Sequence, residues 1–189
     1  ATSAVHHHLI DCKKRLQTAL VVETADAREV MHFALLSGYG ASAINPYLAF
    51  AVINDLVERQ EIQLEYNTAV KNYIKAIDKG LLKVMSKMGI STLTSYKGAQ
   101  LFEAIGVSEE MSRKYFGNTV SKIGGIDMND LSRDILKSHA ESFSPYFDEE
   151  LPLRHLGQYS FRKDGETHAW NPESIATLQL ATRLGSYKK

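Results

Sequence analysis

Short apolar runs alternate with segments that are apolar at helical spacing over the first third of the chain. Residues 19–24 form a short apolar run with a β-branched centre, which is typical of a buried strand. Residues 27–36 follow it, with Asp26 as a candidate N-cap and Glu29 three residues further on. That combination resembles a capping box and predicts a helix that Gly38 ends.

The same order of elements repeats in the next stretch. Residues 41–44 form a second short apolar run, and a helical pattern follows over residues 47–59. Strand, helix, strand, helix with short connections is the pattern of parallel βαβ units. A longer segment, residues 67–88, is apolar at helical spacing, and Gly80 is expected to break it into two helices. Residues 90–93 form a candidate third strand.

The second half of the chain is predicted to contain more helices. One helix is expected over residues 97–105, where Gly106 stops it. Two amphipathic helices are expected at residues 108–116 and 129–143, separated by the glycine-bearing segment 122–126. The fold class expected from these patterns is α/β, helix-rich, with parallel βαβ units.

The chain becomes irregular and aromatic over residues 146–170. We interpret this segment as a linker or an extended cover, with a short hairpin around residues 163–165. A helix begins after it, with Asn171 as the N-cap and Pro172 at the first helical position.

The composition is that of an ordinary globular chain without net charge. Its 189 residues are 44% apolar, enough for one domain or one and a half. Lys and Arg number 22, as do Asp and Glu, which argues against nucleic acid or an acidic membrane as a partner. No apolar run approaches the roughly 20 residues of a membrane span, and no signal-peptide pattern is present. The single cysteine, Cys12, favours a reducing compartment such as the cytoplasm.

Three consecutive histidines, residues 6–8, lie in a predicted helix over residues 2–15. Helical neighbours point about 100° apart, so this run lacks the i, i+4 spacing of metal-binding helices. A transition-metal site would require His6 or His7 together with His32 or another distant ligand. The alternative is that these histidines are partly buried or make polar contacts.

Two further motifs lie at expected turns. Residues 38–43 match the pattern G-x-G-x-x-G/A, but they follow a helix and precede a strand, the reverse of what a dinucleotide site requires. We interpret them as a helix C-cap and a tight turn. Thr94, Ser95 and Lys97 are expected between a strand and a helix, where free amides bind phosphate or carboxylate. The alternative is that Thr94 or Ser95 only caps the helix. No residue pattern indicates a catalytic centre.

Nine strings of the sequence carry a family resemblance that covers nearly the whole chain. They are TSAVHHHLI (2–10), VVET (21–24), AREV (27–30), YGA (39–41), AINPY (43–47), KGLLKVMSKMGIST (79–92), YKGAQ (96–100), IGGI (123–126) and HAWNPESI (168–175). Together they resemble the large subunit of the glutamate synthases. The resemblance implies that the histidine run is a native helix motif. Both ends of the chain interrupt a pattern, so we expect a piece of a longer polypeptide.

The resemblance also implies a domain organisation. The large chains of that family join a glutamine amidotransferase domain, a central α/β domain, an FMN-binding (β/α)8 barrel and a β-helix. Residues 1–143 would be the C-terminal part of the central domain, 144–170 a connecting segment, and 171–189 the first helix leading into the FMN-binding synthase domain. The central domain of this family is an incomplete, barrel-like (β/α) fold.

The implied activity is the conversion of glutamine, 2-oxoglutarate and a reductant into two glutamates. This chain is expected to couple the glutaminase and synthase centres and to help shape the ammonia tunnel, without catalysis of its own. FMN and a [3Fe-4S] cluster are implied for the parent enzyme, as are a small subunit or ferredoxin as partners besides the remaining domains. No residue here takes over those roles, because the chain has no N-terminal cysteine and no three-cysteine cluster. The alternative is a vestigial phosphate or flavin site near Thr94–Lys97. The expected location is the cytoplasm, or a plastid in a photosynthetic eukaryote.

Overall fold

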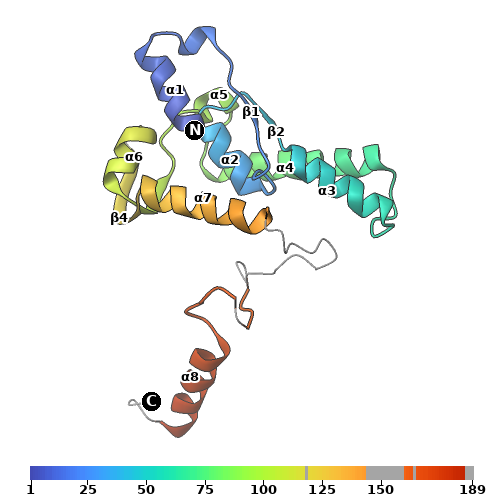
Figure 1. The fold of residues 1–189 in the computed structure, drawn as a ribbon, viewed down its shortest axis with the longest axis vertical. Coiled ribbons are helices and arrows are strands. Elements are labelled where there is room, and N and C mark those ends of the chain that lie inside the picture. Colours follow the sequence, from blue (N-terminus) through green and yellow to red (C-terminus); the bar gives the residue numbers. More distant parts are fainter. Residues whose placement is uncertain (118, 144–159, 164, 186–189) are drawn as a thin grey trace. The chain divides into compact units, whose positions relative to one another are not determined.

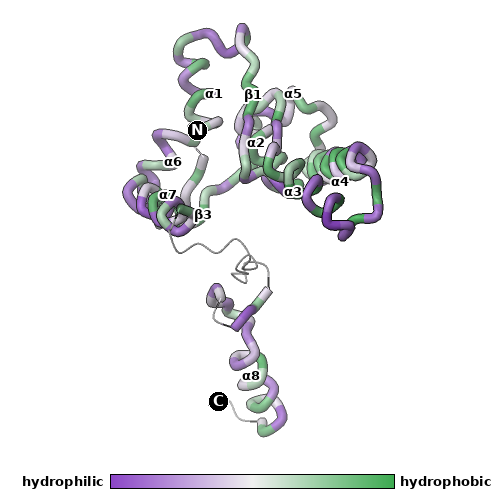
Figure 2. Tube along the Cα trace, turned by 45° about the vertical axis from the view of Figure 1, so that its right-hand side comes forward, coloured by the Kyte–Doolittle hydropathy of each residue, from purple (hydrophilic) through white to green (hydrophobic). Residues whose placement is uncertain are grey.

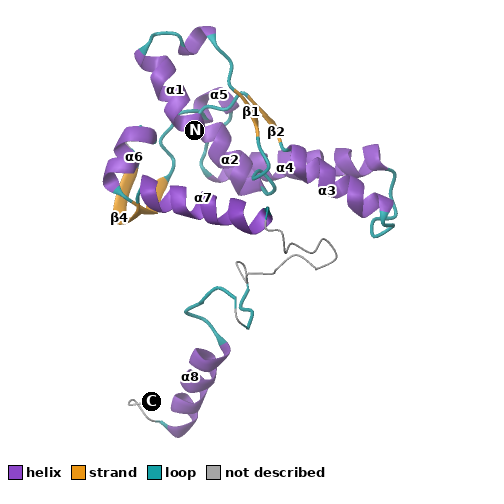
Figure 3. Cartoon of the chain, viewed as in Figure 1, coloured by secondary structure: helices purple, strands orange, loops and turns teal. Residues whose placement is uncertain are grey.

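The structure, a computed structural model, describes residues 1–117, 119–143, 160–163 and 165–185. Helices dominate it and the strands are short (Figure 3). The elements in chain order (Figure 1) are α1 Thr2–Asp11, η1 Arg15–Gln17, β1 Val21–Glu23, α2 Val30–Gly38, β2 Ala43–Asn45, α3 Tyr47–Glu58, α4 Tyr66–Lys87, α5 Leu93–Tyr96, β3 Glu103–Val107, α6 Glu109–Tyr115, β4 Val120–Ile126, α7 Met128–Ser142 and α8 Pro172–Leu184. The chain divides into two compact units, Ala1–Leu136 and Lys137–Lys189.

The first parallel strand pair confirms the predicted βαβ order. Strands β1 and β2 run parallel, with Val21 opposite Ala43, and α2 connects them. The expectation that the first strand is buried is wrong, because Val21 is 72% exposed. A pair of strands covers little of its own faces, so an apolar run indicates a strand without indicating what covers it.

Helix α2 begins at Val30, three residues later than predicted. The ring Nδ1 of His32 lies 3.2 Å from the backbone nitrogens of Arg28 and Glu29 and accepts from them. These two amides have no partner within the helix, so a histidine in the first turn replaces the predicted Asp26 cap. The predicted end of the helix at Gly38 is confirmed.

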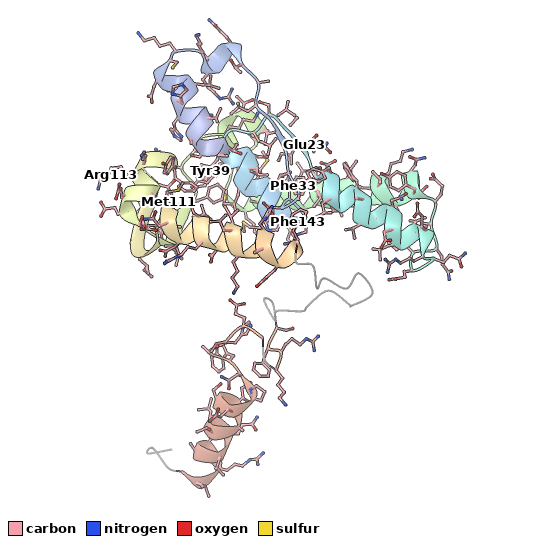
Figure 4. The ribbon with its side chains drawn as sticks, viewed as in Figure 1. Glu23, Phe33, Tyr39, Met111, Arg113 and Phe143 are labelled. Carbon is pink, nitrogen blue, oxygen red and sulfur yellow. The ribbon has the colours of Figure 1, made fainter. Side chains whose placement is uncertain are left out.

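The hydrophobic core of the first unit lies between α2 and α4. Its buried centre is Ala27, Phe33 and Ile77, and the half-buried residues packed on it are Val30, Leu36, Ile44, Tyr73 and Leu81. Phe33 points inward from α2 (Figure 4), and its ring meets the Tyr73 ring edge to face with centroids 6.5 Å apart. The Tyr73 hydroxyl donates to the Arg28 carbonyl at 3.0 Å. This hydrogen bond joins α4 to the residues that precede α2.

The predicted break at Gly80 is wrong, because α4 runs without interruption from Tyr66 to Lys87. Gly80 lies where the Val30 side chain packs against the helix backbone. A Cβ at Gly80 would overlap both methyl groups of Val30. The glycine therefore serves close helix approach, while its φ remains compatible with a continuous helix.

The predicted third strand at residues 90–93 is also wrong. Gly89 ends α4 with φ +70°, as expected, but residues 90–92 have no regular structure and α5 begins at Leu93. Thr92 caps α5 through its Oγ1, which accepts from the Ser95 backbone nitrogen at 3.3 Å. The cap residue is thus Thr92 and not Thr94 or Ser95.

The helix predicted at residues 97–105 is wrong, because residues 103–107 form a strand. The glycine-bearing segment 122–126, expected only to separate two helices, belongs to the strand that pairs with it. Strands β3 and β4 run parallel, with Glu103 opposite Val120, and α6 connects them. A Cβ at Gly125 would overlap the backbone of Gly106, so the two glycines permit a close backbone approach at a register irregularity. Such a pairing joins residues that are far apart in the chain. A prediction made from each segment alone therefore does not detect it.

The predicted helices at residues 108–116, 129–143 and 171 onward are confirmed as α6, α7 and α8. In the second unit, Asn171 caps α8 by accepting from the Ser174 backbone nitrogen at 2.9 Å, and Pro172 takes the first position. Gly185 ends the helix in the left-handed conformation. The segment expected as a cover, 146–170, lies outside the described residues up to position 159, and the expected hairpin includes residue 164, which also lies outside them.

Candidate functional site

A cleft of about 380 Å³ lies where α1, the end of α2, the turn after α5 and the turn after α6 meet. We call it the histidine cleft. Its lining residues are His6, His7, Ile10, Gly38, Tyr39, Lys97, Gly98, Gln100, Phe102, Phe116, Gly117 and Thr119. The structure thus brings together three of the residues singled out from the sequence, namely His6, His7 and Lys97. Thr94 and Ser95 are exposed on α5 and do not line it.

His6 is held by Arg15. The Arg15 Nε donates to the His6 Nδ1 at 2.8 Å, and its two terminal nitrogens donate to the carbonyls of Thr18 and Gly40 at 2.6 and 2.8 Å. Because Nδ1 accepts a hydrogen bond, the proton of the neutral ring lies on Nε2. Burial lowers the pKa of His6, and the nearby charges of Arg15, His7 and Lys97 lower it further.

His7 has the opposite hydrogen-bond pattern. Its Nδ1 lies 2.8 Å from the carbonyl oxygen of buried Ser3, one helical turn earlier, and donates to it. The proton of a neutral His7 ring is therefore on Nδ1. The rings of His6 and His7 meet edge to face with centroids 5.1 Å apart.

Two glycines make room for the two imidazoles. Gly40 has φ +105° and Gly117 has φ +51°, conformations that favour glycine. A Cβ at Gly40 would overlap the His6 ring, and a Cβ at Gly117 would overlap the His7 ring. Gly40 belongs to the motif read as a C-cap and tight turn, and the structure places that motif between α2 and β2 as expected.

Aromatic side chains form one wall of the cleft. The Tyr39 ring stacks on Phe102 at 5.5 Å and meets Phe116 edge to face at 5.6 Å, so it lies between the end of α2 and α6 (Figure 4). Thr119 Oγ1 donates to the Phe116 carbonyl at 2.7 Å, and the Tyr39 hydroxyl, 2.9 Å away, therefore donates to Thr119 Oγ1. This wall is polar only at its tip.

His6, His7 and His32 are the candidate metal ligands in the sequence. The part of the chain that the structure describes holds no group of three His, Cys, Asp or Glu side chains able to bind a metal. Arg15 occupies Nδ1 of His6, and His32 is used at the start of α2. A metal role for His6 or His7 stays a prediction. An iron–sulfur cluster does not fit this chain, because such clusters need several thiolates and Cys12 is the only cysteine.

The family described as the glutamate synthase central domain matches residues 1–108. The chain belongs to this family. It is 44% identical over 187 residues to the glutamate synthase [NADPH] large chain of Bacillus subtilis, covering 99% of this chain and 12% of that protein. It is 44% identical over 186 residues to glutamate synthase [NADH] of Schizosaccharomyces pombe, covering 97% and 9%, and 42% identical over 190 residues to ferredoxin-dependent glutamate synthase of the alga Antithamnion, covering 95% and 12%. The chain therefore spans only about a tenth of the length of these relatives.

Several residues that line the cleft or hold its histidines were missed from the sequence. Arg15, Tyr39, Phe102 and Thr119 lie on four different segments, and nothing in their local spacing indicates that they meet. The histidine run and the glycine at position 40 were visible, but their contact joins positions 34 residues apart in the chain.

Within the described residues, no helix is long and apolar enough to cross a membrane.

The His6 environment predicts a pH dependence of stability for this domain. The pKa of His6 in the fold lies below its ordinary value of 6.5, so the unfolded chain takes up this proton at a higher pH than the folded chain. The free energy of unfolding is therefore expected to fall as the pH drops below 6.5. Urea unfolding at about pH 7.5 and about pH 5.5 measures this change.

The matched variants for this measurement are His6→Gln and His8→Gln. His6→Gln keeps an acceptor for Arg15 but removes the proton site, so the acid-dependent loss should be smaller than in the wild type. His8 is exposed on the same helix and does not line the cleft, so His8→Gln should retain the wild-type pH dependence. An unchanged pH dependence in His6→Gln would contradict the assignment.

Proposed function

We propose that the chain is an interdomain part of a glutamate synthase large chain and is not catalytic alone. In this role it couples the glutaminase and synthase centres structurally and helps to shape the ammonia tunnel between them. The observation that carries the proposal is the coverage. Relatives match 95–100% of this chain, whereas the chain covers 9–12% of their length.

The domain assignment forms part of the same proposal. Residues 1–143 are the C-terminal part of the central domain, 144–170 connect it, and 171–189 begin the FMN-binding synthase domain. Two parallel βαβ units in sequence, β1–α2–β2 and β3–α6–β4, support an incomplete barrel-like (β/α) fold for the first segment, because barrels of this kind are built from such repeats.

Exposed apolar side chains support packing against other domains. They include Tyr47, Leu48 and Val52 on α3, Ile105, Val120 and Ile123 on the second strand pair, and Ile175, Leu178, Leu180 and Leu184 on α8. Figure 2 shows hydrophobic and hydrophilic residues alternating along α8, the pattern of a helix with one apolar face. Exposed apolar surface of this extent marks sites of interaction.

The parent enzyme in this proposal converts glutamine, 2-oxoglutarate and a reductant into two glutamates. Its FMN, its [3Fe-4S] cluster and its small subunit or ferredoxin contact residues outside this chain, and its location is the cytoplasm or a plastid. Relatives named for NADPH, NADH and ferredoxin match this chain at 42–44% identity. That range of donors supports a role for this segment that does not depend on the electron donor.

A domain exchange in the Bacillus subtilis large chain tests the proposal. Replacing the 187 matching residues by this chain should preserve glutamine-dependent glutamate formation. Replacing them by a glycine–serine linker of equal length should abolish it, because a flexible linker cannot hold two centres in register. The isolated chain of 189 residues, supplied with FMN and a reductant, should form no glutamate from glutamine or from ammonia.

Glutamine hydrolysis and flavin absorbance of each exchanged protein serve as folding controls. If the chimera that carries this chain hydrolyses glutamine and holds flavin but does not couple the two reactions, the proposal is contradicted, and so it is if the linker chimera still couples them. Glutamate formation by the isolated chain above background would contradict it as well.

A further inference from the structure

The histidine cleft contains positive charge that no carboxylate balances. Among the residues that the structure describes, neither Arg15 nor Lys97 forms an ion pair, and the described lining of the cleft includes no Asp or Glu. Some basic residues elsewhere in the fold form ion pairs, such as Arg113 with Glu109 and Lys122 with Glu103, and many of the other described ones do not. What distinguishes the cleft is that a lysine and two histidines line it without an acidic side chain among the described lining residues.

Hydrogen-bond donors accompany that charge. The Arg15 contact leaves the His6 proton on Nε2, and this atom lies on the side of Gly98, next to Lys97. Lys97, His6 and Gln100, whose side chains carry an ammonium, a ring N–H and an amide, thus line one cleft. An oxyanion accepts from such donors, and bonds between charged partners are stronger than neutral ones.

Another part of the cleft lining is aromatic. Tyr39, Phe102 and Phe116 line it, and the only hydroxyl among these three already donates to Thr119. This surface is suited to a carbon skeleton and offers little to a bare inorganic anion. A volume of about 380 Å³ lies at the lower end of the range for small-molecule sites.

We propose that the histidine cleft is a binding site for a small organic carboxylate, with Lys97 and the Nε2–H of His6 holding the carboxylate and Tyr39 and Phe102 packing on the carbon skeleton. This site goes beyond the coupling role proposed above, and it differs from a phosphate or flavin site on the Thr94–Lys97 turn. The cleft lies between α1, the end of α2 and the turns after α5 and α6, so a bound carboxylate would contact separate segments of the first unit.

Three probes distinguish the contribution of the carboxylate charge from that of the carbon skeleton. Benzoate carries a carboxylate on a planar ring, benzamide has the same shape without the charge, and inorganic phosphate has charge without a carbon skeleton. Titration calorimetry on the chain at about pH 7.5 should show saturable binding of benzoate, with benzamide and phosphate roughly tenfold weaker or more. Phosphate that binds as tightly as benzoate would overturn the carboxylate assignment, and so would benzamide that does.

Two lysine variants place the site in the cleft. Lys97→Gln should weaken benzoate binding roughly tenfold, whereas Lys83→Gln, the same change at an exposed position of α4 outside the cleft, should leave it unaltered. Equal affinity in Lys97→Gln and the wild type would overturn the proposal. Circular dichroism checks that both variants fold.

Imidazole resonances test the same site in the unsubstituted chain. Benzoate should shift the ring resonances of His6 and leave those of exposed His8 in place. This measurement does not depend on any variant folding. A wild-type chain in which no His6 resonance moves, or in which benzoate does not saturate, would also overturn the proposal. Neither outcome bears on the domain exchange, which reports on the coupling role alone.

Discussion

Replacing Gly40 with alanine is expected to reduce the free energy of unfolding by about 3 kcal/mol. Two costs add at this position. At φ +105° an L-residue is strained, and the new methyl group overlaps the His6 ring. That ring cannot move away freely, because Arg15 holds its Nδ1 at 2.8 Å and the His7 ring lies against it. Urea unfolding followed by circular dichroism measures the loss.

Gly89→Ala is the matched control for this variant. Gly89 also has a positive φ, +70°, but a Cβ there would meet no atom within 4 Å. Only the backbone strain remains, so the expected loss is about 1 kcal/mol. In a His6→Ala background the overlap is absent. Gly40→Ala should therefore cost less there than in the wild-type background. Equal losses in Gly40→Ala and Gly89→Ala would show that the imidazole does not fill the space beside Gly40.

Gly80→Ala is expected to destabilise the chain by about 2 kcal/mol, although helix propensity alone predicts a gain of about 1 kcal/mol. Gly80 lies inside α4, where alanine is the better helix former. Its Cβ would, however, overlap both methyl groups of Val30, which is β-branched and begins α2. A gain in the free energy of unfolding would mean that Gly80 only weakens the helix. A loss would mean that Gly80 makes room for the Val30 side chain.

Val30→Ala provides the background in which the sign should reverse. Without the valine methyl groups, alanine at position 80 has room and should be neutral or stabilising by up to about 1 kcal/mol. Thermal or urea unfolding of the two single variants and the double variant completes this cycle. Stabilisation by Gly80→Ala in the wild-type background would mean that α2 does not press on α4 at this point.

Elements with a strong local signal were well predicted from the sequence. Helices α3, α7 and α8 carry apolar residues at helical spacing over 12 to 15 residues, and α8 has Asn171 as its cap. The helical character and the end of α4 at Gly89 were predicted as well, but not its continuity through Gly80. Such signals depend only on residues within one element. The same is true of the first βαβ unit, in which two short apolar runs flank one helix.

Elements that depend on distant partners were not predicted. Strand β3 contains Ile105 and Val107 but also alanine and glycine, and its identity as a strand depends on pairing with β4, whose own segment Lys122–Ile126 reads as a glycine-rich loop. Side-chain packing and pairing with the partner strand determine strand formation more than intrinsic preference does. The helix predicted at residues 97–105 was wrong for this reason.

The candidate site divides in the same way. His6, His7 and Lys97 were recognised from the residues and their neighbours along the chain, and the interpretation of the histidine run as a polar, partly buried feature agrees with the contacts of His6 and His7. Arg15, Phe102 and Thr119 could not be associated with them, because these residues meet only when α1, α2, α5 and α6 come together.

The sequence by itself determined the family of this chain, the α/β class, the amphipathic helices and the first parallel unit, because each of these depends on residue patterns that are local or long enough to be specific. The tertiary structure alone decided the second strand pair, the packing roles of Gly40, Gly80 and Gly117, and the assembly of the histidine cleft. A glycine has the same local signature whether it breaks a helix, turns the chain or accepts a neighbouring side chain. Only the position of that neighbour distinguishes these roles, and that position is a property of the packed chain.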